Sequence, residues 1–560
     1  MPCLNQCATS WMPPDARFTK QSRFIRDLFQ SFHWHRNEMS QPKTPLLYAL
    51  TKRNSNDKFS LLRLFRNMAQ MLIIRGSHMA SPKEMSPGGN RLEPNVVSFW
   101  GLVSQSLAGM APTCDVVAFM TAGAAFALVA LPLSYLLAFV LMFIEVNTIY
   151  HLSKHRTSAG GYYAYVSSGL GPTAALITAL MVIFYQVVSV AGVPVYVAGV
   201  FLPGLAHMVG ITLPSWFWLV GILFFIGVPW VLTVLGIRPT VKTLVFTSGV
   251  EILFLVVTSV VIISETHIHQ PLHPFDMAAV GVKGVAMGMI FAITSFIGVG
   301  SHAPLGEESQ ATGIQTQKGR VIGKAAIVSL TLVGAALTLA AYALTVGWGQ
   351  ANMGAFANAN APGVTVYLHY LGPIGAIALV VLAVNSALMD DLALLTSSAR
   401  VLYAVGRDKL LQTSFAQVNG RRAPVHSVTV LALVALVIGV GFGWWLGPVQ
   451  AFNVLTTAVL FGLVTAHTLM NLSLMRISHS ERNLAQIVFH LALPVLAMGL
   501  FWFVLYESLL PFVFPLAWAA VFWAIAMIPA IVYALKATRH MDTTRGHHLG
   551  IHEEDVPVGI

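Results

Sequence analysis

The sequence predicts an all-α polytopic membrane protein with twelve transmembrane helices. Hydrophobic residues make up 56% of the 560 residues and charged residues only 10%, whereas soluble domains usually carry about 25% charged residues. From residue 95 onward, apolar runs long enough to cross a bilayer recur between short polar loops. Because lipid cannot satisfy an open backbone, we expect these runs to be helices.

The twelve expected spans also have a predicted orientation. Their ranges are 96–123, 124–153, 171–203, 214–236, 239–264, 279–306, 323–347, 371–405, 424–446, 449–476, 486–508 and 511–537. If the first span starts in the cytoplasm, 17 Lys and Arg of the loops and C-terminal tail lie inside and only Lys283 lies outside. The positive-inside rule therefore predicts that both termini lie in the cytoplasm, and we expect the protein in the plasma or inner membrane.

Residues 1–94 differ from the rest of the chain. They are polar and basic, hold 14 of the 32 Lys and Arg, and contain no run long enough to span a bilayer. Residues 75–79 read Arg-Gly-Ser-His-Met, similar to the remnant of an expression tag. We expect either a disordered cytoplasmic segment or upstream sequence from an early start, with the true start near Met79 or Met85.

Two expected spans carry helix-breaking residues at corresponding places. Gly109 and Pro112 interrupt span one, and Gly298, Gly300 and Pro304 interrupt span six. Proline lacks an N–H and clashes with the preceding turn, and irregular backbone inside a membrane is tolerated only where it is buried or lines a cavity. Each break alone is more often a kink or a packing notch. Their matched positions, however, favour a transporter site whose backbone groups bind a zwitterion such as an α-amino acid.

Motifs at the span boundaries resemble those of the amino acid/polyamine/organocation permease superfamily. They are Ser158-Ala-Gly-Gly-Tyr-Tyr-Ala-Tyr165 with Gly169-Leu-Gly-Pro172, Phe296-Ile-Gly298 with Gly306-Glu-Glu308, and Ser398-Ala-Arg-Val-Leu-Tyr-Ala-Val-Gly-Arg-Asp-Lys409 with Ala423-Pro424. The resemblance covers about residues 95 to 540. It implies a LeuT-like fold of two inverted five-helix repeats, 95–264 and 279–476, then two peripheral helices, 486–537, and a cytoplasmic tail, 538–560.

The same resemblance implies secondary active transport of amino acids, commonly coupled to protons. It places the substrate backbone on Ala108, Gly109, Met110 and Ala111 in span one and on Phe296, Ile297, Gly298 and Val299 in span six. Gly300 replaces the family's usual acid after the second break, which favours a neutral amino acid. Because of the acid Asp115, a transporter or exchanger of polyamines or basic amino acids remains an alternative.

Carboxylates inside the spans are costly and face a cavity or a partner by default. Asp115 is either a site residue or a helix cap. Two of these acids are candidates for carrying a proton or another cation. Glu251 stands in a span where some relatives have a lysine, and Asp390 shares a helix face with Ser386. Glu145 is expected to pair locally, for example with Lys154.

Two glutamates at the end of span six, Glu307 and Glu308, are interpreted as gate or scaffold residues. We expect them to pair with the loop bases Arg400 or Arg407.

Other classes of function are less well supported. The sequence shows no nucleophile with a base, no His-Glu-x-x-His pattern and no nucleotide loop, so we expect no enzyme, no cofactor and no metal site. Its positive charge is explained by membrane topology, so we expect no nucleic-acid partner. A non-transporting amino acid sensor with the same fold remains an alternative.

Overall fold

The computed structural model describes residues 91–268, 270–311, 315–478, 483–541 and 549–550. The segment predicted for residues 1–94 therefore lies outside the described residues, except for its last four. Most of the tail predicted for 538–560 lies outside them as well. The regular secondary structure of the described residues is helical, and the one β contact among them is an isolated bridge between Val97 and Ser309.

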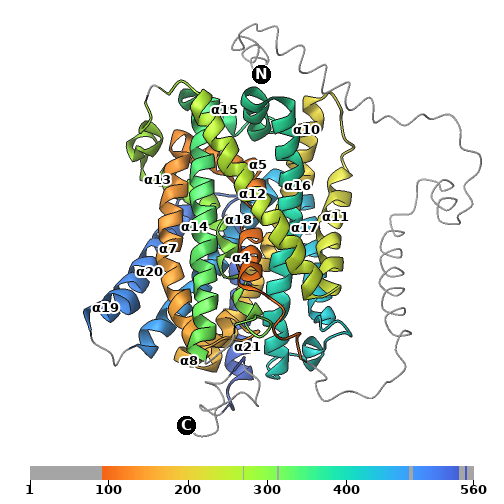
Figure 1. Ribbon diagram of the computed structural model, residues 1–560, viewed down its shortest axis with the longest axis vertical. Helices are drawn as coiled ribbons and strands as arrows, with labels where there is room; N and C mark the ends of the chain where they lie inside the picture. Colours follow the sequence, from red (N-terminus) through yellow and green to blue (C-terminus); the bar gives the residue numbers. More distant parts are fainter. Residues whose placement is uncertain (1–90, 269, 312–314, 479–482, 542–548, 551–560) are drawn as a thin grey trace, which may run out of the picture. The chain divides into compact units, whose positions relative to one another are not determined.

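The helices follow one another in the order that the hydropathy predicts (Figure 1). Their bounds are α4 Phe99–Ala108, α5 Pro112–Val117, α6 Phe119–Ala127, α7 Leu131–His155, α8 Tyr162–Leu170, α9 Pro172–Tyr196, α10 Leu202–Met208, α11 Phe217–Val234, α12 Ile237–Glu265, α13 Gly281–Thr294, α14 Gln315–Trp348, α15 Met353–Phe356, α16 Pro362–Arg407, α17 Val425–Leu446, α18 Pro448–Ile477, α19 Leu484–Ile487, α20 Leu493–Leu509 and α21 Trp518–Ala537. Short 3-10 and π turns join several of them.

Eleven helical stretches in the described residues are long and apolar enough to cross a membrane. Span one does not count among them by itself, because it is divided into α4, α5 and α6, and its last part is joined to α7 in the stretch Phe119–His155. The number twelve therefore depends on reading α4 to α6 as one interrupted span. It stays a prediction, as does the inverted repeat.

The predicted span ranges follow the helix bounds closely, with the largest difference at span eight. Its start was expected at residue 371, but α16 begins at Pro362. The helix carries one non-helical residue, Gly372, with φ 67° and ψ −171°. The segment before this kink is therefore a short helical stretch leading into the span.

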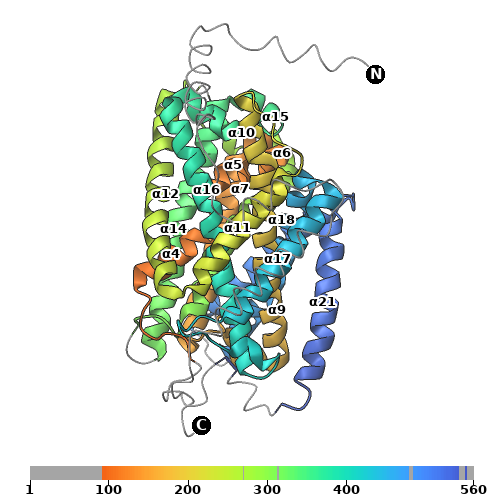
Figure 2. The same cartoon turned by 90° about the vertical axis from the view of Figure 1, so that its right-hand side faces the viewer.

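The interrupted first span lies among the other long helices. Helix α4 contacts α12 and α14, and α5 contacts α16; Figure 1 shows α4 and α5 between these neighbours. The last two helices are peripheral, since few residues of the stretch Leu484–Leu509 are buried and only Ala519, Ala530 and Ala534 are buried in α21. Figure 2 shows α21 along the outer edge. Helix α8 lies at the opposite end of the bundle from α10 and α15 (Figure 1).

Candidate functional site

Both predicted helix breaks are present. Helix α4 ends at Ala108, and Ala111 adopts left-handed φ 40° and ψ 55° before α5 starts at Pro112. In span six, α13 ends at Thr294 and gives way to the 3-10 turn η5, Ile297–Gly300. The residues assigned to substrate binding are buried, and all of them except Asp115 lie at these two breaks: Ala108, Gly109, Met110 and Ala111 at the first, and Phe296, Ile297, Gly298, Val299 and Gly300 at the second.

The two breaks touch each other through glycine. A Cβ atom placed on Gly298 would lie 2.1 Å from the carbonyl carbon of Gly109 and 2.2 Å from its oxygen. A Cβ on Gly109 would lie 3.1 Å from the Cα of Gly298, which is tight but less severe. The backbones of the two interrupted spans are therefore in direct contact, and Gly298 is the residue that allows it.

Polar contacts hold α4, the first part of span one, to span six. The hydroxyl of Ser301 donates to the carbonyl of Gln105, 3.0 Å away, and the hydroxyl of Ser106 lies 2.6 Å from Nδ1 of His302. Since Nε2 of His302 lies 2.8 Å from the carbonyl of Ile322, that nitrogen carries the proton and Nδ1 accepts from Ser106. The imidazole of His302 thus links span six to α4 and to α14 by hydrogen bonds.

Asp115 is buried beside the breaks, but it is not a helix cap. It lies inside α5, whose N-cap residue is Ala111 and has no side-chain cap bond. One carboxylate oxygen of Asp115 accepts a hydrogen bond from Ser295 of span six, and the other has no partner among the described residues. The cap interpretation is therefore wrong, whereas a role in the site is left open.

Glu251 connects three helices at the end of the first break. The side-chain amide of Asn385 in α16 donates to its carboxylate at 2.8 Å, and the carboxylate also faces Thr113 of α5 and Ser386 of α16. The hydroxyls of Thr113 and Ser386 are buried and lie close to this carboxylate. Two hydroxyls, one amide and one carboxylate thus meet at the junction of α5, α12 and α16.

Asp390 and Asp391 are both buried in α16. Neither carboxylate oxygen of Asp391 has a hydrogen-bond partner in the described part of the chain. Cys114 lies within electrostatic range of these two acids and of Asp115 and Glu251. Four of the acids inside the spans therefore lie near Cys114, just after the break in span one, whereas Glu145 does not belong to this group.

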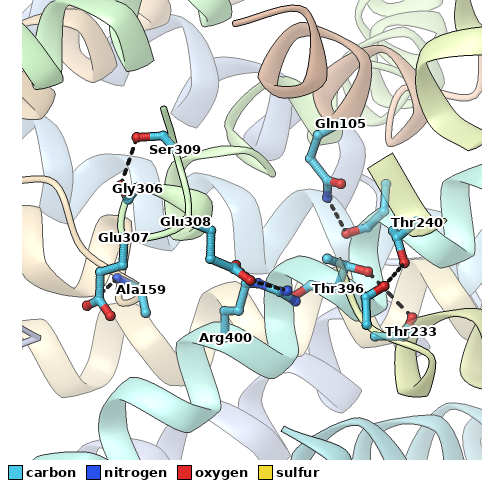
Figure 3. A network of polar contacts seen from close by, with 12 residues as sticks. Gln105, Ala159, Thr233, Thr240, Gly306, Glu307, Glu308, Ser309, Thr396 and Arg400 are labelled. Atoms are coloured by element: carbon cyan, nitrogen blue, oxygen red, sulfur yellow. Dashed lines mark hydrogen bonds and ion pairs between the residues drawn. The ribbon is translucent and has the colours of Figure 1, made fainter. Parts of the chain in front are cut away.

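A second polar group lies near the end of α16 (Figure 3). Glu308 forms a two-point ion pair with Arg400, and both side chains are buried. Its neighbour Glu307 diverges to the other side in Figure 3, toward Ala159, whose backbone N–H donates to one of its oxygens at 2.9 Å. Glu307 also pairs with Arg407, with N···O distances of 2.9 and 3.0 Å.

The C-terminal residues Leu549 and Gly550 bind next to the Glu307–Arg407 pair. The carbonyl of Gly550 accepts from Arg407 at 2.5 Å, and its N–H donates to Asp408 at 2.6 Å. The hydroxyl of Tyr163 in α8 also donates to Asp408, at 2.7 Å. Burial raises the pKa of Asp408 to about 6, although these two donors oppose the shift.

Glu145 pairs with a distant helix rather than with Lys154, so the expected local pairing is wrong. Nδ1 of His467 in α18 lies 2.8 Å from one oxygen of Glu145, and the amide of Asn471 donates to the other oxygen at 2.8 Å. All three side chains are buried. A pattern of polar residues four apart on α18, at 467 and 471, is the only sequence signal that could have indicated this partner.

Comparison with known proteins identifies the family of the chain. A family model described as amino acid permease matches residues 101–543, which extends from α4 past the end of α21. A search of curated proteins finds no match. The matched region makes up most of the chain and contains both helix breaks and all the buried acids discussed above. The chain is a multi-pass membrane protein that belongs to the amino acid permease family, a family of amino acid transporters.

Proposed function

We propose that this protein is a secondary active transporter of neutral amino acids, coupled to protons and working by alternating access. The substrate backbone binds at the breaks, on Ala108–Ala111 and on Phe296–Gly300. The observation that carries the proposal is the direct contact of these two segments, in which a Cβ on Gly298 would overlap the Gly109 carbonyl. Non-helical backbone of two spans that meets inside a membrane protein is suited to binding charged groups by N–H and C=O dipoles.

Glu251 is the leading candidate for the coupling proton. Its carboxylate contacts Asn385 and faces both Thr113, just after the first break, and Ser386. A proton on this carboxylate turns one of its oxygens into a hydrogen-bond donor while the other still accepts, so the polarity of its contacts with α5 and α16 changes. Asp390, buried on the same helix as Ser386, is the second candidate.

Glu307, Glu308, Arg400 and Arg407 form a cytoplasmic gate in this proposal. Their two ion pairs tie the end of span six to the end of α16. The basic residues of these loops support a cytoplasmic location for this end of the protein and for both termini.

A transporter or exchanger of basic amino acids or polyamines is the second candidate. The observation in its favour is the buried carboxylate of Asp115, which has one oxygen without a partner in the described residues. That oxygen is available to a substrate ammonium.

Uptake into proteoliposomes tests the proposal. Purified protein is reconstituted with an inward proton gradient and supplied with radiolabelled neutral or basic amino acids or with putrescine. We expect saturable, concentrative uptake of neutral amino acids that a protonophore abolishes, with protein-free liposomes as the background control. Concentrative uptake of basic compounds alone would favour the second candidate. An absence of gradient-dependent uptake of every compound would contradict transport and favour a sensor.

A further inference from the structure

The first residue of α8 contacts the break in span six. Tyr162 is 3% exposed, and its ring ends at Gly300, the last residue of η5. A Cβ atom on Gly300 would lie only 1.7 Å from the hydroxyl oxygen of Tyr162 and 2.3 Å from Cζ. The tyrosine hydroxyl therefore fills the space that a side chain at position 300 would occupy.

The hydroxyl of Tyr162 has no hydrogen-bond partner among the described residues. Buried hydroxyls are nearly always paired in folded proteins, and an unpaired one requires a specific explanation. The Tyr162 hydroxyl lies against Gly300, two residues after Gly298, where spans one and six touch. A ligand bound at the two breaks is within reach to supply the missing partner.

The ring of Tyr162 is held firmly in this position. The ring of His467 packs edge-on against it, with centroids 5.4 Å apart and planes at 84°. His467 is itself fixed by the 2.8 Å contact between its Nδ1 and Glu145. The buried pair of His467 and Glu145 thus restricts the position of the Tyr162 ring.

The backbone before Tyr162 is equally restrained. Gly161 has φ +50°, and a Cβ on it would lie 2.9 Å from the ring of Pro304 in span six. The N–H of Ala159 is bonded to Glu307. The start of α8 and the second half of span six therefore fix the tyrosine hydroxyl relative to Gly300.

We infer that Tyr162 is a substrate-contacting residue that determines specificity, and that its hydroxyl acts in place of a side chain at position 300. The inference rests on the proposed substrate site and adds the group that distinguishes substrates there. A phenol donates and accepts hydrogen bonds without carrying a charge. It therefore binds the ammonium or a polar side chain of a neutral amino acid and gives no electrostatic compensation to a second positive charge.

Removal of the hydroxyl alone is the first test. In the proteoliposome assay, Tyr162→Phe is expected to raise the half-saturation concentration of the preferred neutral amino acid about tenfold, with a smaller change in maximal rate, because one hydrogen bond is lost. Tyr165→Phe is the matched control. It removes another buried, unpaired hydroxyl from the same helix and is expected to change the half-saturation concentration less than about twofold.

Exchange of the two positions is the second test. Gly300→Ser alone places a Cβ on the phenol and is expected to abolish uptake, whereas Tyr162→Ala with Gly300→Ser frees the space and restores it. Tyr162→Ala with Gly300→Glu puts an acid in the same place and is expected to improve uptake of lysine relative to neutral amino acids at least tenfold over Tyr162→Ala alone.

Three results overturn the inference. If wild-type protein transports amino acids and Tyr162→Phe matches it, the hydroxyl does not contact the substrate, while the proposed function stands. If Tyr162→Ala with Gly300→Ser is as inactive as Gly300→Ser alone, position 300 and Tyr162 do not share one role. The same follows if Tyr162→Ala with Gly300→Glu has the selectivity of Tyr162→Ala. If wild-type protein transports no amino acid, the proposed function fails and the inference with it.

Discussion

The guanidinium of Arg400 and the carboxylate of Glu308 form a two-point ion pair in which neither side chain is more than 2% exposed. Nη2 of Arg400 donates to one oxygen at 3.0 Å, and Nε donates to the other. The remaining terminal nitrogen donates to the carbonyl of Thr396 at 3.0 Å. The backbone carbonyl of Glu308 accepts from Val96 and Val97, both at 2.9 Å. This pair therefore joins the segment before α4, the end of span six and α16.

Arg400→Gln is expected to destabilise the protein by about 3–5 kcal/mol, because it leaves the Glu308 carboxylate buried without a charge partner. Glu308→Gln should have an effect of similar size. The double variant Glu308→Gln with Arg400→Gln is expected to lose much less than the sum of the two single variants. Melting temperatures measured in detergent by size-exclusion chromatography provide the comparison.

The partly exposed pair of Glu307 and Arg407, whose side chains are 17% and 14% exposed, is the control for this experiment. Glu307→Gln is expected to cost about 1 kcal/mol or less, since water screens the remaining charge. Equal losses in the two glutamine variants, or strictly additive losses in the double variant, would show that burial does not make the Glu308–Arg400 pair special.

Gly298→Ala is expected to be far more disruptive than Gly109→Ala. The added methyl group at 298 would lie 2.1 Å from backbone, whereas the one at 109 has its closest contact at 3.1 Å. Overpacking that small side-chain shifts cannot relieve typically costs about 1–3 kcal/mol or more. Yield of monodisperse protein and its melting temperature measure the difference. Similar behaviour of the two variants would indicate that the two breaks are not packed as described.

Glu251→Gln is expected to change the pH dependence of uptake more than the half-saturation concentration of the substrate. The amide keeps the hydrogen-bonding shape of the side chain toward Asn385 but can no longer take up a proton. Asp390→Asn tests the second candidate in the same assay. Glu265→Gln, at the exposed end of the same helix, is the control and should leave the pH profile unchanged. Wild-type profiles in both of the first two variants would exclude them as coupling residues.

Asp408 is expected to make the protein less stable as the pH rises through about 6. Its pKa is raised from 3.8 to about 6 by burial, so the folded state favours the protonated form. Its contribution is fully present below pH ~4 and is lost between pH ~4 and ~6, by about 3 kcal/mol for a shift of about two units. In melting curves recorded from pH 4 to 8, Asp408→Asn should lack this decline.

The asparagine at position 408 can still accept a hydrogen bond from Tyr163, so the comparison isolates the charge. Asp276→Asn, which changes an exposed carboxylate in a loop, should retain the wild-type decline. A decline of the same size in Asp408→Asn and in the wild type would assign the pH dependence to other groups.

Hydropathy and helix-breaking residues were sufficient to predict most of the helical architecture. An apolar run of about 20 residues leaves the chain few alternatives in lipid, and Pro112 and Gly298 mark the breaks because proline and glycine act on the local backbone. The kink at Gly372 was not predicted. The helix continues on both sides of it, so the start of α16 was placed nine residues too late.

Contacts between distant helices could not be read from the sequence. Glu145 and His467 are 322 residues apart, and their pairing depends on how α7 packs against α18. The contact of Tyr162 with Gly300 depends likewise on the path of α8 beneath span six. The family resemblance implies that Gly300 replaces an acid, but Tyr162, which fills the space of that side chain, comes from another element.

The contact of Gly550 with Arg407 and Asp408 couples the C-terminal segment to any movement of α16. Its carbonyl and N–H hold the last described residues of the chain to the end of α16, and Leu549 is almost fully buried beside them. Linkage between two equilibria is reciprocal: if α16 moves away from α8 during transport, the tail must detach, and a force that detaches the tail must favour that movement. Cleavage by an added protease near residue 549 would then report the conformational state of the transporter without any attached label.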